Sequence, residues 1–183
     1  MTEHAMAQTD APPGEGWNER LPDGTVVRIR SIGRQDAELE LEFLNHLSPA
    51  FRSSRFLGLV RDPTPEVARE LTNLDPARAV GFIALVSQQG REREIGAAQF
   101  HANAAGDSCD ASLTVSGEWR QRGVGSLLMR HLIAAARARG IRHMRAYAPG
   151  RSGGGDRLAA NIGFQRRLDP RDPATVIYDL SLE

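Results

Sequence analysis

The segment Arg120-Gln121-Arg122-Gly123-Val124-Gly125-Ser126 has the residue types and spacing that could hold an anion. Two glycines separated by one residue let a backbone bend sharply and approach a ligand closely. An apolar helical pattern begins at Val124, so the first N–H groups of that helix would point outward at the positive end of its dipole. Arg120 and Arg122 could add charge-assisted hydrogen bonds of about 1.5–3 kcal/mol each. The segment predicts a pyrophosphate-binding loop, although a tight strand-to-helix turn with surface arginines also fits it.

Two better-known phosphate-binding loops do not fit this segment. The dinucleotide fingerprint needs a third glycine, and position 128 is leucine. The Walker A loop needs a lysine, whereas all 23 basic residues of this chain are arginines. The absence of lysine also excludes a pyridoxal-phosphate Schiff base and lysine nucleophiles in general.

The formal net charge of zero conceals two halves of opposite sign. Residues 1–116 carry 11 Arg against 17 acidic residues, a net charge of −6, and residues 117–183 carry 12 Arg against 6, a net charge of +6. Residues 119–155 hold eight Arg and no acidic residue. This asymmetry favours an anionic partner for the second half, although solvated arginines on helix faces also fit it. We expect no nucleic acid partner, because few aromatic residues interleave with these arginines.

The number and spacing of the cysteine, histidine and apolar residues exclude several other classes of protein. Cys109 is the only cysteine, which rules out an intrachain disulfide and a cysteine zinc cluster. The five histidines form no pair four residues apart, so we expect no metal. No apolar run approaches the roughly 18–20 residues of a transmembrane helix, and no signal peptide is visible. These features predict a cytoplasmic protein with no membrane partner.

Hydrophobic periodicity predicts a flexible tail over residues 1–20 and a single mixed α/β domain over 21–183. Its early strands should be mostly antiparallel, with a parallel crossover around the long helix that ends at Gly140. The predicted strands cover 25–32, 79–87, 94–101, 111–115, 141–148, 164–168 and 176–182, and the predicted helices cover 34–47, 50–57, 64–74, 124–139 and 156–162.

Residues 115–125, Val-Ser-Gly-Glu-Trp-Arg-Gln-Arg-Gly-Val-Gly, resemble the acetyl-CoA loop of the GNAT acyltransferases. That loop has the pattern Gln/Arg-x-x-Gly-x-Gly/Ala and follows an aromatic residue and a strand ending in valine. The long helix after it and the later sequence Ile162-Gly163-Phe164 match as well. The opening over 23–30, followed by a Leu/Glu-rich helix and Leu47-Ser48-Pro49, is similar to the acetyltransferase domain of bacterial Pat-type protein acetyltransferases. The resemblance covers residues 21–183.

The resemblance implies a GNAT-type mixed central sheet, antiparallel in its N-terminal part and with splayed parallel strands around a CoA-binding loop and helix. Acetyl-CoA would be the co-substrate, with its pantetheine arm against one strand as if it were an extra strand. The backbone amides of 122–126 would hold its pyrophosphate. The cofactor-binding residues would be Leu113, Thr114, Val115, Arg120, Gln121, Arg122, Gly123, Val124, Gly125, Ser126 and Ser152.

The same resemblance implies a general base at Asp110, where Pat-type domains carry a glutamate. Aspartate is one methylene shorter, so it would act through a bridging water. Asp110 could instead simply begin a strand. Many GNAT enzymes have an Asn and a Tyr near the last helix, and the corresponding residues here are Ser152 and Ala159. The sequence therefore identifies no general acid for the leaving thiolate.

We expect an N-acetyltransferase that moves an acetyl group from acetyl-CoA directly to a primary amine in a ternary complex. A protein lysine is the favoured acceptor and a small-molecule amine is possible; a monomer and a homodimer both remain open. One alternative is a non-catalytic module that binds or senses acyl-CoA, because Asp replaces Glu and the Tyr is missing. Residues 150–154 also fit the G-x-S-x-G nucleophile elbow, but no histidine follows them in the chain.

Overall fold

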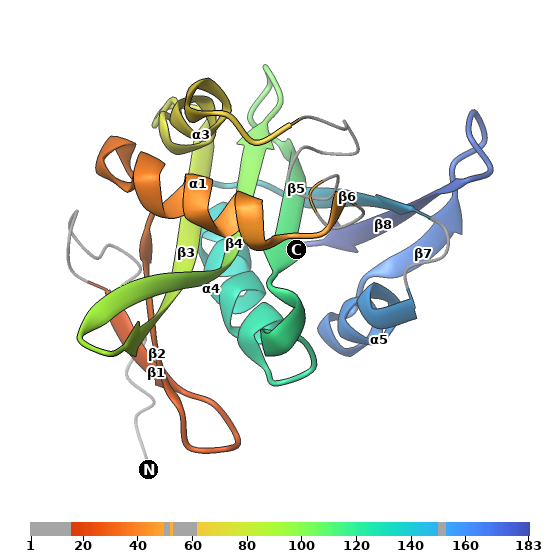
Figure 1. Cartoon of the computed structure of the whole chain (residues 1–183). Coiled ribbons are helices and arrows are strands. Elements are labelled where there is room, and N and C mark those ends of the chain that lie inside the picture. The colour runs from red at the N-terminus through yellow and green to blue at the C-terminus, as the bar shows by residue number, and fades with distance from the viewer. Residues whose placement is uncertain (1–15, 50–51, 53–61, 150–152) are drawn as a thin grey trace, which may run out of the picture.

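The computed structural model describes residues 16–49, 52, 62–149 and 153–183. One eight-stranded sheet, ordered β1-β2-β3-β4-β5-β6-β8-β7, runs through the molecule from β1 and β2 at one end to β7 and β8 at the other (Figure 1). The strands are β1 (Trp17–Arg20), β2 (Val26–Ser31), β3 (Ala79–Gln88), β4 (Arg91–Ala102), β5 (Ser108–Val115), β6 (His143–Pro149), β7 (Gln165–Leu168) and β8 (Thr175–Ser181). The helices are α1 (Ala37–His46), α3 (Pro65–Thr72), α4 (Val124–Ala138) and α5 (Gly153–Ile162), with short 3₁₀ turns η1 (Arg34–Asp36) and η2 (Gly117–Trp119).

The sheet has the predicted mixed topology. Strands β5 and β6 are parallel, and the other neighbouring strands are antiparallel. A parallel pair needs a crossover connection, and the chain supplies it through α4, which lies between β5 and β6 in the sequence. The predicted helix over 50–57 falls outside the described residues, apart from Arg52.

Strands β5 and β6 splay apart partway along their length. Their pairing ends where Ala111 faces Ala146. Beyond that point β5 stays paired with β4 as far as Val115, and β6 stays paired with β8 as far as Pro149. Within the described part of the chain, the backbone of residues 112–115 therefore has no strand partner on its β6 side. The expected wedge between two parallel strands is present.

Each face of the sheet has its own hydrophobic core. On one face α4 buries Leu128 and Leu132 against strand residues that include Ile95 and Phe100. On the opposite face the core contains α1 and α3 residues packed on β3 and β4: Phe43, Leu44, Leu47, Val67, Leu71, Ile83, Leu85 and Ala97. Helices therefore cover both faces of the central strands.

Local sequence signals account for the bounds of α4. Gly123 adopts φ 101° just before the helix, and Gly140 adopts φ 74° just after it, a region that favours glycine. The apolar stripe from Val124 through Leu128 to Leu132 is buried, as the helical spacing predicts. The predicted helix over 124–139 matches the observed one to within a residue.

The prediction of a tail extending to residue 20 is wrong at its end, because Trp17–Arg20 forms the edge strand β1 against β2. The Trp17 ring stacks on His131 of α4, with 4.3 Å between ring centroids. The Glu19 carboxylate accepts hydrogen bonds from Arg130 (2.5 Å) and His131 (2.9 Å). These contacts with α4, which lies more than a hundred residues away in the chain, hold β1 in place.

A buried ion pair precedes α1. The Arg30 guanidinium donates to both carboxylate oxygens of Asp36 at 2.8 and 2.7 Å, and the Gly33 N–H donates to the same carboxylate at 2.8 Å. The Asp36 side chain is 2% exposed. Residues 38–43 alternate in polarity as a strand would, yet they form α1, because the apolar side of this helix packs on the sheet.

Candidate active site

The loop that leads into α4 has the backbone shape expected of an anion-binding turn. Gln121 (φ 59°) and Gly123 (φ 101°) both adopt the left-handed conformation, on either side of Arg122. Gly123 is the N-cap of α4 and has no side chain with which to cap it. The N–H groups of the first helical turn, at Val124, Gly125 and Ser126, have no partner within the helix and lie at the positive end of its dipole.

The Arg122 guanidinium is engaged within the protein. It lies over the Trp119 ring, with 4.1 Å between the Arg122 Cζ atom and the ring centroid. Its Nη2 and Nε atoms donate to Asp23 Oδ2 at 2.7 and 3.1 Å. Arg120 is half-buried where η2 ends. The structure therefore places both arginines at the loop, while their contact with a phosphate stays a prediction.

The second glycine of the motif allows close packing between elements. A Cβ atom at Gly125 would lie 2.9 Å from Leu158 Cδ2 of α5 and 3.4 Å from Leu113 Cδ2 of β5. The absence of a side chain at Gly125 thus lets the start of α4 lie close to both α5 and the splayed strand β5.

The three β5 residues predicted to contact the pantetheine arm all lie beyond the splay. Alternation along the strand places Leu113 and Val115 on the α4 face, where they pack against its core. Thr114 points to the opposite face and is buried, and its hydroxyl has no hydrogen-bond partner among the described residues. The β6-facing backbone edge of this segment is the unpaired edge described above, as the predicted β-strand-like contact requires.

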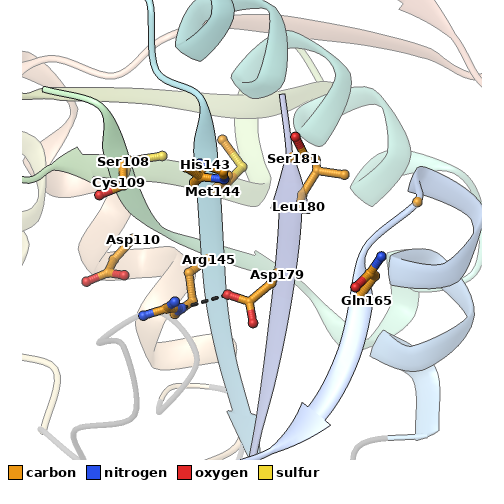
Figure 2. A pocket seen from close by; sticks show the side chains of 11 residues that line it. Ser108, Cys109, Asp110, His143, Met144, Arg145, Gln165, Asp179, Leu180 and Ser181 are labelled. Carbon is orange, nitrogen blue, oxygen red and sulfur yellow. Dashed lines mark hydrogen bonds and ion pairs between the residues drawn. The ribbon is translucent and has the colours of Figure 1, made fainter. Parts of the chain in front are cut away.

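Asp110 lies on β5 just before the splay and is exposed. Its register partners are His101 on β4 and Arg145 on β6. Within the described part of the chain, the Asp110 carboxylate makes no hydrogen bond or ion pair. It points in the same direction as the Arg145 side chain, on the face of the sheet opposite α4 (Figure 2).

Asp110 and Arg145 line a pocket of about 440 Å³ formed on β5, β6 and β8. The side chains that share its face are Ser108, Asp110, His143, Arg145, Asp179 and Ser181 (Figure 2). The pocket contains groups of both charge signs at the foot of the wedge. It is therefore suited to a polar ligand that binds beside the paired part of β5 and β6, on the side opposite α4.

In this pocket Arg145 and Arg167 form ion pairs with the same carboxylate, that of Asp179. Asp179 Oδ1 accepts from Arg145 Nε at 2.7 Å, and Asp179 Oδ2 accepts from Arg167 Nε at 2.7 Å. The hydrogen bond to Asp179, followed by one to Tyr147, raises the pKa of Arg145 above its ordinary value. Arg145 is therefore cationic near neutral pH.

Cys109, Tyr178 and Glu118 are each buried or bound to another residue. Burial, followed by the neighbouring Asp110 charge, raises the pKa of the Cys109 thiol to about 12, so this thiol is not a nucleophile near neutral pH. The Tyr178 hydroxyl donates to Asp156 of α5. Glu118 is exposed and pairs with Arg93 at 2.6 Å. Ala159 lies within α5, and Ser152 lies outside the described residues.

The described residues contain neither a candidate metal site nor a helix that could span a membrane. Within these ranges no group of three or more His, Cys, Asp or Glu side chains could hold a metal ion. In the same part of the chain, no helix combines the length and the apolar character needed to cross a bilayer.

Reasoning from the sequence did not identify Arg145, Asp179 or Asp23 as site residues. Arg145 and Asp179 meet only because β6 pairs with β8 in one particular register. Asp23 reaches Arg122 across 99 positions of the chain. Polar side chains at alternate positions of the strands over 141–148 and 176–182 were the available signal, and it does not reveal which residues meet.

The comparisons with known proteins agree with this geometry. The sequence model of the acetyltransferase (GNAT) family matches residues 41–150. An acetyltransferase of Pseudomonas aeruginosa is 35% identical over 172 residues, covering 94% of this chain and 92% of the relative.

Solved structures share the fold at lower sequence identity. The GNAT domain of S. lividans PAT is 23% identical, with a TM-score of 0.77 over 94% of this chain and 99% of that domain. A cAMP-binding acyltransferase from Mycobacterium smegmatis is 19% identical, with a TM-score of 0.64 over 92% of this chain, which spans 48% of that larger protein. The family match, the related acetyltransferase and the splayed sheet together show that this chain belongs to the GNAT acetyltransferase family.

Proposed function

We propose that this protein transfers an acetyl group from acetyl-CoA directly to a primary amine within a ternary complex. The observation that carries the proposal is the wedge between β5 and β6, with the α4 loop on one side and the exposed Asp110 at its foot. Acetyl transfer as such follows from the family; the donor, the amine and the roles of the residues are the proposal.

In the proposed complex the α4 loop binds the pyrophosphate of acetyl-CoA. The backbone amides of residues 122–126 and the guanidinium of Arg120 supply the donors. Leu113, Thr114 and Val115 offer their unpaired backbone edge to the pantetheine amides. These contacts direct the thioester toward the foot of the wedge.

The acceptor amine has to lose a proton before it attacks. For a lysine-like amine with a pKa of about 10.4, the neutral form costs about 4.6 kcal/mol at pH 7. Asp110 takes this proton through a bridging water as the amine nitrogen bonds to the thioester carbon. The C–S bond then breaks and the thiolate takes a proton from solvent, because Ala159 stands where many GNAT enzymes have a tyrosine.

A protein lysine is the first candidate acceptor, on the strength of the resemblance to Pat-type domains. A small-molecule amine is the second, because the pocket beside Asp110 has a volume of about 440 Å³. The enzyme cannot modify side chains of its own, since the chain contains no lysine. We place the activity in the cytoplasm, without a metal, and in a monomer or homodimer.

A non-catalytic acyl-CoA sensor is the alternative from another class of function. The missing tyrosine and the shorter acid at Asp110 favour it. Calorimetry with acetyl-CoA, followed by thiol release across a panel of proteins, polyamines and amino acids, separates the two. Binding with amine-dependent thiol release supports the enzyme, and binding with no release supports the sensor. No binding would overturn both.

A further inference from the structure

Asp110 and Arg145 carry opposite charges and line the same pocket. They are register partners on adjacent parallel strands, so their backbones lie about 4.8 Å apart and their side chains share one face. Figure 2 shows both side chains extending into the same opening. Within the described residues no ion pair joins the two side chains, and Arg145 pairs with Asp179 instead. A ligand that carries both an ammonium and an anionic group can therefore satisfy the two residues at once.

The charge of Arg145 is not cancelled by its protein partner. The single carboxylate of Asp179 is shared with Arg167, so these three side chains together carry one net positive charge. Asp179 occupies the Nε atom of Arg145. A guanidinium has five N–H donors, so donors remain on a side chain that is 45% exposed.

We propose that the acceptor carries a carboxylate or phosphate close to its reacting amine, and that Arg145 binds this anion while Asp110 faces the amine. Asp179 is a positioning residue that holds the Arg145 guanidinium. The inference rests on the proposed function, since it names the substrate class of the same site. The anion can come from a free amino acid or from an acidic side chain beside a lysine in a peptide.

Matched acceptors test the inference and distinguish these two sources. One arm compares a series of amino acids with their carboxamides, and the other compares lysine peptides that have Glu or Gln next to the lysine. We expect the anionic member to have a kcat/KM at least about tenfold higher in one of the arms, as a charge-assisted hydrogen bond to a guanidinium supplies. Equal rates in both arms, or faster reaction of the neutral members, would overturn the inference.

Variants then assign the preference to Arg145. Arg145→Gln should remove the difference between anionic and neutral acceptors, Arg145→Lys should keep part of it, and Asp179→Asn should weaken it. Arg91→Gln, an exposed charge change at the β3–β4 hairpin, is the matched control and should leave it intact. Thermal melting and acetyl-CoA affinity confirm that each variant is folded. A preference that persists in Arg145→Gln contradicts the assignment.

Calorimetric binding of the same acceptors to the CoA-loaded protein supplies a readout independent of acetyl transfer. Tighter binding of the anionic members, lost in Arg145→Gln, supports the inference even if no thiol is released, in which case the proposed function fails alone. Thiol release without any charge preference in binding or rate leaves the proposed function in place and removes the inference.

Discussion

Asp23 and Arg122 join the turn between β1 and β2 to the loop that begins α4. Asp23 Oδ2 accepts from Arg122 at 2.7 Å, while Asp23 Oδ1 accepts the Thr25 N–H at 2.9 Å. The same turn contacts the loop backbone, because a Cβ at Gly123 would lie 3.4 Å from Pro22. The N-terminal hairpin therefore helps to set the shape of the predicted pyrophosphate site.

The first prediction concerns Asp23→Asn. Loss of this ion pair should let Arg122 and its loop move, which we expect to weaken acetyl-CoA binding by about tenfold, the scale of one charge-assisted hydrogen bond. Acceptor KM should stay unchanged. Isothermal titration gives the affinity, and Asp172→Asn is the control, since Asp172 orders a turn through Ala174 without an arginine. Unchanged affinity would show that the hairpin does not shape the site.

The pH dependence of this contact has a definite sign. The Thr25 N–H and then the Arg122 guanidinium lower the pKa of Asp23 from 3.8 to about 2. Because the folded-state pKa is depressed, the stabilising contribution is present above the ordinary pKa and is lost as pH falls through about 2. The loss of acetyl-CoA affinity caused by Asp23→Asn should thus be equal at about pH 6 and about pH 9.

The second prediction concerns Gly123→Ala. Alanine at φ 101° is strained by about 1–2 kcal/mol, so the loop should shift and acetyl-CoA binding should fall sharply. Gly117→Ala is the matched control, because a Cβ there meets nothing within 4 Å. Titration of both variants with acetyl-CoA is the measurement, and equal affinities would count against the loop as the phosphate site.

The third prediction concerns Asp110→Asn. If Asp110 is the base, kcat/KM should fall by about 10²–10⁴-fold, and the dependence of the rate on an ionised carboxylate should disappear from the pH profile. Acetyl-CoA affinity should be unchanged. Glu118→Gln, at an exposed acid in the preceding loop, should keep full activity. Full kcat/KM in Asp110→Asn across the pH range would exclude this role.

The fourth prediction concerns Cys109. Burial, followed by the neighbouring Asp110, raises its pKa to about 12, so the folded protein should resist alkylation by iodoacetamide at about pH 8. Labelling should be complete in denaturant, as mass spectrometry would record. Cys109→Ala should retain acetyl transfer. Loss of transfer in a folded variant would indicate that the thiol takes part in the reaction.

The fifth prediction concerns the buried pair Arg30–Asp36. Asp36→Ala leaves the Arg30 charge without its partner and should lower the free energy of unfolding by about 3–5 kcal/mol in urea denaturation. Glu92→Ala, which removes the partner of the exposed Arg28, should cost at most about 1 kcal/mol. Similar losses in the two variants would mean that the burial of Asp36 matters little.

The parts of the fold predicted from the sequence are those whose signal is local. The helix over 124–139 combines an apolar stripe with Gly140, and the strands over 79–87 and 94–101 flank a Gln-Gly turn. Strand β1 lacks such a signal, since three of its four residues are polar and its Trp17 is held by a contact with the distant His131.

The candidate site likewise contains residues with a local sequence signal and residues without one. The loop over 120–126 and Asp110 were identified from short motifs and the resemblance they carry. Arg145 was not, because its place beside Asp110 depends on the register of three strands distant in sequence. Local patterns define which residues face a sheet's surface, whereas tertiary pairing decides which of them meet.

The edge position of β1 has a practical consequence for anyone shortening this protein. A form that starts at Leu21 would lose Trp17 and Glu19, and with them the cover over Phe82 and His131. Strand β2 would then become the open rim of the sheet, a surface that promotes self-association. Purification tags and fusion partners are therefore best joined upstream of residue 16, so that β1 remains intact.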